Sequence, residues 1–462
     1  MSRSRPQTTP IRRGDLVEVE IVARGEGPDG IAKLGDYVVF VPGTLPGERV
    51  FVEITSAARK FGRGEPLELL LPAADRVEPF CKHFLDCGGC HLQHQLYGAQ
   101  LDDKRARLSR GLAHALGERA PEVAATIAAK PSHGQRHKVA LHLRNAPGGR
   151  LEGCFHRQRS VELVAVRECP ASDPLAWDLA NATVALLAEL PLDAWHPFRA
   201  PDGLLRTVLV RATTGGEAHV LVVAREARVP GLETLVPRLH AAGATTISVN
   251  TNDGEPSRLL GPRTHVVSGP RRITEEIGGV RHLLSPSAFF QTSPQAAAHL
   301  VDLVLTWLRP TADDDVADLY CGAGLLTLPL ARRARAVLGC ELAGAAVDDA
   351  VAAAELNGIH NVHWFRGRAE HALVRCRTGE LPRPRLVALD PPRRGLEPAV
   401  IAELAELRPS RIAYVSCEPQ TLQRDLAAFD AAGFRTTLVT PVDMFPHTSH
   451  VEAVAWLTDR SG

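Results

Sequence analysis

Three features are missing from this sequence: a net charge, a long apolar run and an internal repeat. Lys and Arg together number 53, as do Asp and Glu, so the formal net charge at pH 7 is +0. No apolar run approaches the roughly 18 residues of a membrane-spanning helix. The N-terminal stretch MSRSRPQTTPIRR is basic and has no apolar segment behind it, unlike a secretory signal. These absences argue against a membrane protein, a secreted protein and a repeat protein.

The cysteines do not form the pattern of a disulfide framework. There are nine of them, an odd number, spread over 462 residues. Disulfide-rich secreted domains carry an even number of cysteines within a short chain. The pattern therefore predicts a protein of the reducing cytoplasm. With 45% hydrophobic residues, a chain of this length can form roughly two to four globular domains.

One segment departs from the neutral charge balance. Between positions 130 and 160 the chain carries seven Lys or Arg residues against one acid, Glu152. This set, called the basic stripe below, comprises Lys130, Arg136, Lys138, Arg144, Arg150, Arg157 and Arg159. Such a run is typical of a solvated surface, and also of a single nucleic-acid-facing surface on a neutral protein. The residues alone leave both interpretations open.

Turn signals and hydrophobic patterns divide the chain into four parts. Residues 1–13 are predicted to be a flexible basic tail. Residues 14–72 alternate polar and apolar positions between Pro-Gly turns, which predicts a small OB-like β-barrel. Residues 73–285 hold a cysteine cluster followed by mixed strands and helices, which predicts an α+β domain. Residues 286–462 alternate strands with helices, which predicts a doubly wound, Rossmann-like sheet with ligands at the carboxyl ends of its strands.

A compact cysteine cluster predicts a metal centre in the central domain. Cys81, Cys87 and Cys90 are separated by five and then two residues, and two glycines between the last pair allow a tight loop. A fourth ligand is required, and Cys154 and Cys169 are both candidates. Four thiolates suit zinc or an iron–sulfur cluster. Zinc sites usually contain two close cysteine pairs, whereas this loop has one, so a [4Fe–4S] cluster is favoured over zinc.

The first strand-to-helix turn of residues 286–462 has features of a nucleoside-binding loop. The stretch DLYCGAG contains two glycines, which let the backbone approach a ligand closely. Glu341 ends the next strand, where an acid commonly binds ribose hydroxyls. Farther on, Asp390 opens a rigid Asp-Pro-Pro turn after another apolar run. The combination predicts a cofactor pocket, although a packing turn in an unrelated α/β domain can also contain two glycines.

Two residues near the end of the chain are candidates for covalent chemistry. Cys417 follows the apolar run IAYVS, and a thiol at a strand end can act as a nucleophile. Most isolated cysteines, however, are inert residues of a core. Glu452 lies near Asp443, His447 and His450, and each of the four could serve as a base. From the residues alone the choice of base stays open.

Six stretches occur in the order found in one enzyme family. They are the cysteine loop, FFQ, DLYCGAG, DPPRRG, SCEP and FPHTSHVE. Over nearly its whole length the chain resembles the RNA 5-methyluridine (uracil-5) methyltransferases with a TRAM domain and an iron–sulfur cluster. The resemblance implies a multidomain α/β protein. Residues 14–72 correspond to TRAM, an OB-like RNA-binding module, and residues 286–462 to a class I S-adenosylmethionine (SAM)-dependent methyltransferase domain.

The resemblance also assigns roles to individual residues. It implies Cys417 as the nucleophile and Glu452 as the base, and it places Asp390 close to the target uracil as well as to the cofactor. The residues implied to contact SAM are Gln291, Tyr320, Glu341 and Asp390. The implied ligands of the [4Fe–4S] cluster are Cys81, Cys87, Cys90 and Cys169, the last chosen because it precedes a proline.

The implied activity is methylation of carbon 5 of a uridine in RNA through a covalent adduct between Cys417 and carbon 6. Ribosomal RNA is favoured over transfer RNA as the partner, no membrane is expected, and the protein is expected to act as a cytoplasmic monomer. The alternative is a non-catalytic or differently reactive iron–sulfur RNA-binding protein. Radical SAM enzymes that carry TRAM need a C-x3-C-x2-C loop, which differs from the spacing here. Cytosine-5 RNA methyltransferases usually carry Pro-Cys where this chain has Asp-Pro-Pro.

Overall fold

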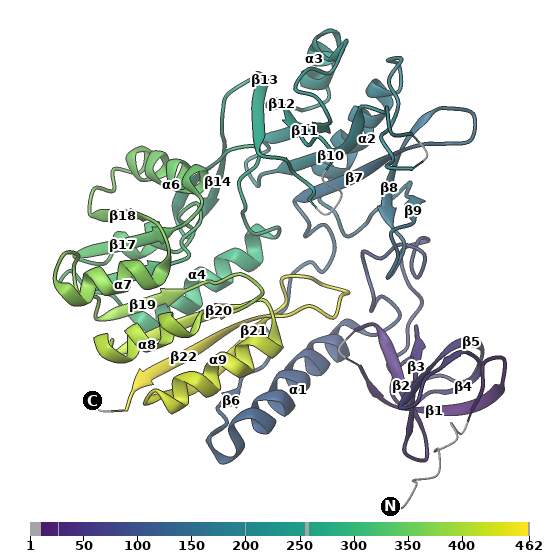
Figure 1. The fold of residues 1–462 in the computed structure, drawn as a ribbon, viewed down its shortest axis with the longest axis horizontal. Helices are drawn as coiled ribbons and strands as arrows, with labels where there is room; N and C mark the ends of the chain where they lie inside the picture. The colour runs from purple at the N-terminus through teal and green to yellow at the C-terminus, as the bar shows by residue number, and fades with distance from the viewer. Residues whose placement is uncertain (1–10, 26, 199, 255–257, 461–462) are drawn as a thin grey trace, which may run out of the picture. The chain divides into compact units, whose positions relative to one another are not determined.

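The computed structural model shows two compact units (Figure 1). The first unit contains the chain up to Gln100 together with residues 156–162 and 447–449, and the second contains the rest. The predicted tail lies outside the described residues, except for its last three positions. No helix among the described residues is long and apolar enough to span a bilayer. The residues that the structure describes are 11–25, 27–198, 200–254 and 258–460.

A closed barrel forms the N-terminal part of the first unit and confirms the predicted OB-like fold. Side chains alternate along its strands, so Val19 and Val52 are buried while Glu18 and Glu53 are exposed. Gly64 lies where a Cβ atom would come within 2.1 Å of a Val52 methyl carbon, so only glycine fits there. The strands, in hydrogen-bonded order, are β1 (Leu16–Arg24), β2 (Asp29–Leu34), β3 (Tyr37–Pro42), β5 (Phe61–Leu71) and β4 (Arg49–Ala57).

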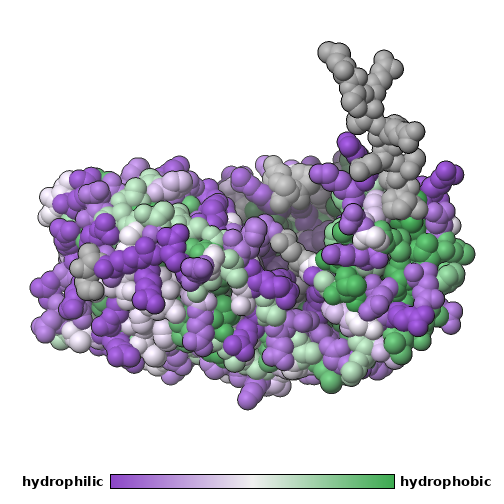
Figure 2. Space-filling view, turned by 90° about the horizontal axis from the view of Figure 1, so that it is seen from below, coloured by the Kyte–Doolittle hydropathy of each residue, from purple (hydrophilic) through white to green (hydrophobic). Residues whose placement is uncertain are grey.

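The outer surface of this barrel carries exposed leucines on the two strands that flank β4. Leu16 on β1 and Leu67, Leu69 and Leu71 on β5 each expose between 40% and 56% of their surface. Figure 2 shows that apolar patches interrupt the otherwise polar surface on the face that it draws. Grouped apolar side chains of this kind lower solubility more than the same residues scattered singly.

A seven-stranded sheet organises the first part of the second unit. Every residue of its strands β11 and β12 is buried, including the polar residues Thr246, Ser248 and Asn250 of β12, so both faces of these strands are covered by protein. Helix α2 (Pro174–Leu187) packs against it, capped by the Asp173 carboxylate, which accepts a hydrogen bond from the Ala176 amide; α3 (Leu232–Ala241) follows β11. The strand order is β13 (Arg263–Ser268), β12 (Thr246–Thr251), β11 (Ala218–Ala224), β10 (Leu205–Ala212), β7 (Lys138–Asn145), β8 (Leu151–His156) and β9 (Leu163–Ala165).

An eight-stranded sheet forms the second part of this unit and confirms the predicted Rossmann-like fold. Its first five strands, β18, β17, β16, β19 and β20, are parallel to one another. Strand β22 is antiparallel to both of its neighbours, β20 and β21, and β6 pairs with β21 at the edge. A separate hairpin of β14 (Ile273–Ile277) and β15 (Val280–Leu284) lies in the chain before β16. The strand order is β18 (Val362–Arg366), β17 (Ala336–Glu341), β16 (Asp315–Leu319), β19 (Leu386–Leu389), β20 (Arg411–Ser416), β22 (Glu452–Asp459), β21 (Phe434–Val442) and β6 (Glu122–Val123).

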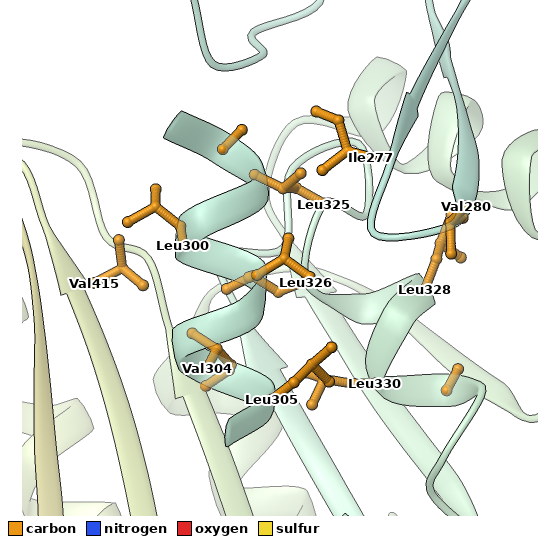
Figure 3. Packing of buried hydrophobic residues seen from close by; sticks show 14 of the residues in the cluster. Ile277, Val280, Leu300, Val304, Leu305, Leu325, Leu326, Leu328, Leu330 and Val415 are labelled. Atoms are coloured by element: carbon orange, nitrogen blue, oxygen red, sulfur yellow. The ribbon is translucent and has the colours of Figure 1, made fainter. Parts of the chain in front are cut away.

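Helices cover both faces of this sheet, because consecutive strand residues enter two separate cores. Ala413 and Val415 of β20 belong to one core, and Ile412 and Tyr414 belong to the other. Figure 3 shows the first core, where side chains of α4 meet Val415 and the turn that follows β16. The first core contains α4 (Pro294–Leu308), α5 (Thr327–Ala331) and α6 (Gly344–Leu356); the second contains α1 (Tyr97–Leu116), α7 (Ala369–Thr378), α8 (Pro398–Leu407) and α9 (Pro419–Ala431).

Candidate active site

Three of the four predicted cofactor residues lie at the carboxyl edge of the eight-stranded sheet. β16 pairs in parallel with β17 and β19, and the last residues of the three strands are in register or one position apart. Tyr320, Glu341 and Asp390 therefore lie at one level, where the strand order changes direction between β16 and β19. Ligands of open α/β sheets bind at such a switch point.

Sheet register also brings Cys417 and Glu452 opposite each other. β20 and β22 are antiparallel, and Ser416 is paired with Ala453. Cys417 is the next residue after Ser416, and Glu452 is the residue before Ala453, so the two face each other across adjacent strands. The Glu452 carboxylate is close enough to raise the pKa of the Cys417 thiol.

Glu452 and the nearby Asp390 both have raised pKa values. Glu452 is buried, and burial followed by repulsion from Asp390 raises the pKa of Glu452 to about 8. The Asp390 side chain keeps some solvent contact, but the protein atoms around the strand end still desolvate it and raise its pKa to about 7. At neutral pH both groups therefore spend much of their time without a charge.

The thiol of Cys417 and one cation complete this cluster. Burial, followed by the charges of Glu452 and Asp390, raises the pKa of half-buried Cys417 to about 11. The Arg393 guanidinium acts in the opposite direction and lowers the pKa of both Cys417 and Glu452. Arg393 was missing from the predicted site. Its position in DPPRRG, three residues after Asp390, was the available signal.

The other residues considered as the base occupy different environments. Asp443 is buried and accepts a hydrogen bond at 2.5 Å from the Lys104 ammonium, so its charge is balanced by an ion pair. His447 belongs to the first unit, where its carbonyl accepts two backbone amide bonds. The His450 ring lies edge-on to Phe445, with the centroids 6.0 Å apart. Of the four candidates, Glu452 is the residue that strand register places opposite Cys417.

The turn after β16 depends on left-handed backbone conformations. Tyr320, Gly322 and Gly324 have φ values of +67°, +52° and +85°. The resulting loop turns its amides toward β17, and the Glu341 carboxylate accepts hydrogen bonds from the amides of Gly322 (3.1 Å) and Ala343 (2.7 Å). Each carboxylate oxygen keeps a further lone pair, so Glu341 can still accept a bond from a ligand hydroxyl.

Asp318 is a buried acid in the same region that the sequence did not single out. It is 0% exposed, and its Oδ2 atom accepts a hydrogen bond at 2.5 Å from the Thr327 hydroxyl. Its Oδ1 atom has no partner within the described part of the chain. Burial is the main cause that raises the pKa of Asp318 to about 7, and the nearby Asp390 charge adds to it. An acid directly before a glycine-rich turn was the signal for this residue.

The fourth predicted cofactor residue, Gln291, lies in an irregular segment before α4. The segment, called the 287–292 loop below, has Phe290 buried against the His282 ring and Phe289 72% exposed. Gln291 is half-buried and follows them. The structure thus places an exposed aromatic ring two positions from the predicted cofactor residue.

The cysteine loop lies in the first unit. Cys81, Cys87 and Cys90 are half-buried, and the Cys87 sulfur accepts a hydrogen bond from the Gly89 amide at 3.4 Å. Gly88 leaves little room for a side chain, because a Cβ atom there would lie 3.1 Å from the His156 carbonyl oxygen. Amide donors to sulfur are typical of thiolates that bind iron–sulfur clusters, so the donor chemistry of the loop fits such a group.

The two candidates for a fourth ligand differ in their surroundings. Cys154 is 0% exposed within β8, and burial raises the pKa of its thiol to about 11. Cys169 is half-buried, and its sulfur accepts a hydrogen bond from the Ser172 hydroxyl at 3.2 Å. Among the described residues, no group of three or more His, Cys, Asp or Glu side chains is arranged to hold a metal ion.

Comparison with known families supports the methyltransferase fold. The profile of the tRNA (Uracil-5-)-methyltransferase family matches residues 281–460, and that of the TRAM domain matches residues 10–67. An uncharacterized RNA methyltransferase of Halalkalibacterium halodurans is 33% identical, covering 98% of each chain. One from Geobacter sulfurreducens is 35% identical, covering 97% of this chain and 91% of its own.

A solved structure matches both units. It is the tRNA (uracil-54, C5)-methyltransferase of Pyrococcus abyssi in complex with S-adenosyl-L-homocysteine (SAH). It superposes with a TM-score of 0.75 at 25% identity and covers 95% of this chain and 98% of its own. At this coverage the match extends into the barrel and into both sheets.

Proposed function

Because this chain belongs to the RNA (uracil-5-)-methyltransferase family, we propose that it transfers a methyl group from SAM to carbon 5 of one uridine in RNA. The observation that carries the proposal is the register that sets Cys417 opposite Glu452, next to Asp390. A nucleophile, a base and a hydrogen-bonding acid are the three groups that this reaction needs.

Cys417 provides the covalent step. Carbon 5 of uracil is too weak a nucleophile to attack a methyl group, but addition of the Cys417 sulfur to carbon 6 turns the ring into an enolate. Asp390 hydrogen-bonds the ring edge during this step. The uracil must leave its base stack to reach a thiol at a strand end. Since the resting thiol has a pKa of about 11, its proton has to pass to a base as the bond forms, and the nearby Asp390 carboxylate is the proposed acceptor.

Glu452 provides the second proton transfer. After carbon 5 has gained the methyl group, its proton must leave, and the electron pair of that C–H bond then restores the ring double bond as the Cys417 sulfur departs. A carboxylate facing the sulfur from the next strand is placed to take this proton. Glu452 must be ionised for this role, and the Arg393 guanidinium favours ionisation.

The cofactor residues suit a positively charged ligand. SAM supplies an electrophilic methyl group on a sulfonium cation. Asp318 and Asp390 have pKa values raised to about 7, and a cation beside them stabilises their charged forms. Glu341 can accept bonds from the ribose hydroxyls, and Tyr320 opens the glycine-rich turn whose Gly322 amide bonds Glu341. Gln291 is assigned to the cofactor by the family resemblance. Burial raises the pKa of Tyr320 to about 12, so its hydroxyl stays protonated.

The first unit and the basic stripe are proposed to hold the RNA. An OB-like barrel suits single-stranded nucleic acid. Within the stripe, Arg144, Arg157 and Arg159 form ion pairs with acids of the protein. Phosphate contacts are therefore assigned to the exposed members of the stripe outside these three pairs, Lys130 and Arg150. These contacts predict an affinity for RNA that falls with salt.

A [4Fe–4S] cluster on Cys81, Cys87, Cys90 and Cys169 is part of the proposal. The half-buried sulfurs, the tight glycine turn and the Gly89 amide bond support it. A cluster with four protein ligands has no open iron, so its role is to stabilise the loop, and no step of the reaction passes through it.

Mapping 5-methyluridine in total RNA tests the proposed function. RNA from cells with and without this protein should differ at one uridine, in the cytoplasmic pool, and purified monomeric protein with SAM should restore it. Ribosomal RNA is the predicted substrate, and transfer RNA is the second candidate because the P. abyssi structure is a tRNA enzyme. Separate maps of the two RNA classes decide between them. If the maps with and without the protein are the same, the proposed activity is refuted, and a non-catalytic or differently reactive RNA-binding protein is the alternative that remains.

A further inference from the structure

Arg211 lies in an environment that is unfavourable for a cation. It is 5% exposed in β10, with Lys138 of β7 and His219 of β11 directly opposite it on the two neighbouring strands. Cations opposite each other across strands repel. The Arg211 charge contributes to lowering the pKa of Lys138 to about 8 and that of His219 to about 3, although burial is the larger cause for both. Such a position costs stability unless the arginine has another role.

Arg211 makes its hydrogen bonds to the 287–292 loop. Its Nη2 atom donates to the carbonyl oxygen of Ala288 (3.3 Å), and its Nη1 atom donates to that of Phe290 (3.4 Å). Its countercharge is Glu275 of β14, whose carboxylate accepts bonds from the Thr214 backbone amide and hydroxyl. One guanidinium thus joins the seven-stranded sheet to the two carbonyls that flank Phe289.

The loop is also held by bonds at its two ends and by the Ala288 amide, which donates to the Ser285 carbonyl oxygen at 3.1 Å. Before it, the Ser285 amide and hydroxyl donate to Asp349 of α6 at 2.9 and 2.6 Å. At its last residue, the Thr292 carbonyl oxygen accepts a hydrogen bond from the His137 amide at 2.9 Å. In the middle of the loop, the Arg211 guanidinium donates side-chain hydrogen bonds to the Ala288 and Phe290 carbonyl oxygens. Phe289 and Gln291 follow the two carbonyls that it holds, so their directions depend on these bonds.

We propose that Arg211 is a positioning residue, which fixes the 287–292 loop so that Gln291 is held ready for the cofactor. The role rests on the proposed function, because it takes Gln291 as a cofactor contact. Arg211 also lies beside a member of the basic stripe, because Lys138 is its partner on β7. The preceding residue, His137, bonds both Ala212 and Thr292 through its backbone.

A double-mutant cycle on SAH binding tests this role without requiring methylation. Isothermal titration of SAH is carried out on full-length protein carrying Arg211→Met, Gln291→Ala or both. Each single change should weaken binding about tenfold, the effect of losing buried hydrogen bonds. The double variant should lose little more than either single one, because Arg211 acts through Gln291. Arg206→Met, on the same strand but over the Trp195 ring, should leave SAH affinity unchanged.

The outcomes separate this inference from the proposed function. Wild-type protein that does not bind SAH would contradict the proposed function itself. Wild-type binding with additive losses, about a hundredfold in the double variant, would overturn the role of Arg211. No loss in Gln291→Ala would overturn it too. If Arg211→Met does not fold, Arg211→Lys enters the same cycle: it keeps the charge and one donor, so it should fold and bind SAH between wild type and Gln291→Ala.

Discussion

Cys417 is the residue on which the proposed chemistry depends most directly. Cys417→Ala should bind SAM and RNA almost normally, because the change removes one half-buried sulfur. It should lower the rate by about four orders of magnitude or more, as expected when a nucleophile is deleted. RNA with 5-fluorouridine at the target should trap wild-type protein on denaturing gels, because fluorine cannot leave as a cation, and the alanine variant should form no adduct.

The control for this experiment is Cys376→Ala. Cys376 is buried in α7, which packs against β17, three strands away from β20 in the sheet, so this variant should form the adduct at the normal rate. Mass spectrometry should map the trapped peptide to Cys417. A peptide containing Cys321 instead, or retained activity in Cys417→Ala, would refute the mechanism and leave the family assignment intact.

At Glu452 the expected defect comes later in the reaction. Glu452→Gln keeps the shape of the side chain but cannot accept the carbon 5 proton. The methylated adduct should therefore form and resolve slowly, so a protein–RNA band should accumulate with natural uridine. Gel analysis over time measures it. Turnover at the wild-type rate would assign the base to another residue, and His450→Ala is then the next variant to measure.

Among the elements of the fold, the cysteine loop makes a prediction that does not depend on activity. Protein purified without oxygen should contain about four irons per chain, and Cys87→Ser should lose them, because a thiolate ligand is removed. Cys154→Ser should retain the four irons, since the Cys154 side chain of β8 is fully buried. Iron and sulfide analysis measures both. Stoichiometric zinc without iron would contradict the cluster. Iron loss in Cys154→Ser would assign the fourth ligand to Cys154 instead of Cys169.

Strand-end residues could be predicted from the sequence because an apolar run reveals where a parallel strand ends. Glu341 and Asp390 were found in this way, Tyr320 was assigned by the family resemblance, and the structure brings all three to one edge. Arg211 could not be found, since a single arginine within an apolar strand gives no sign of what it contacts. The two-residue edge strand β6 was also missed, because two residues show no periodicity.

For the molecule as a whole, the buried acids predict that stability falls as pH rises. The pKa values of Asp318 and Asp390 are raised to about 7 and that of Glu452 to about 8, whereas unfolded chains ionise near pH 4. Between these values the folded protein holds protons that the unfolded chain has released, so the free energy of unfolding decreases with pH. Without ligands, the melting temperature should fall by about 5 °C between pH 5.5 and 7.5.

Asp318→Asn isolates one of these groups. The amide keeps an acceptor for the Thr327 hydroxyl but cannot ionise, so the variant should show a smaller decrease over the same pH range. Calorimetric melting of both proteins in matched buffers measures the difference. Equal decreases would show that Asp318 is not protonated in the folded protein at neutral pH.

The pairing of Ser416 with Ala453 also limits how the length of this chain can change during evolution. A residue gained or lost within β20 or β22 would turn every later side chain to the opposite face and bring Val451 or Ala453 opposite Cys417. Between the two strands, α9 and the turn that follows β21 can change length, because register is re-established where β22 begins. Relatives should therefore differ in spacing between SCEP and HVE, while insertions inside either strand should be absent from active members.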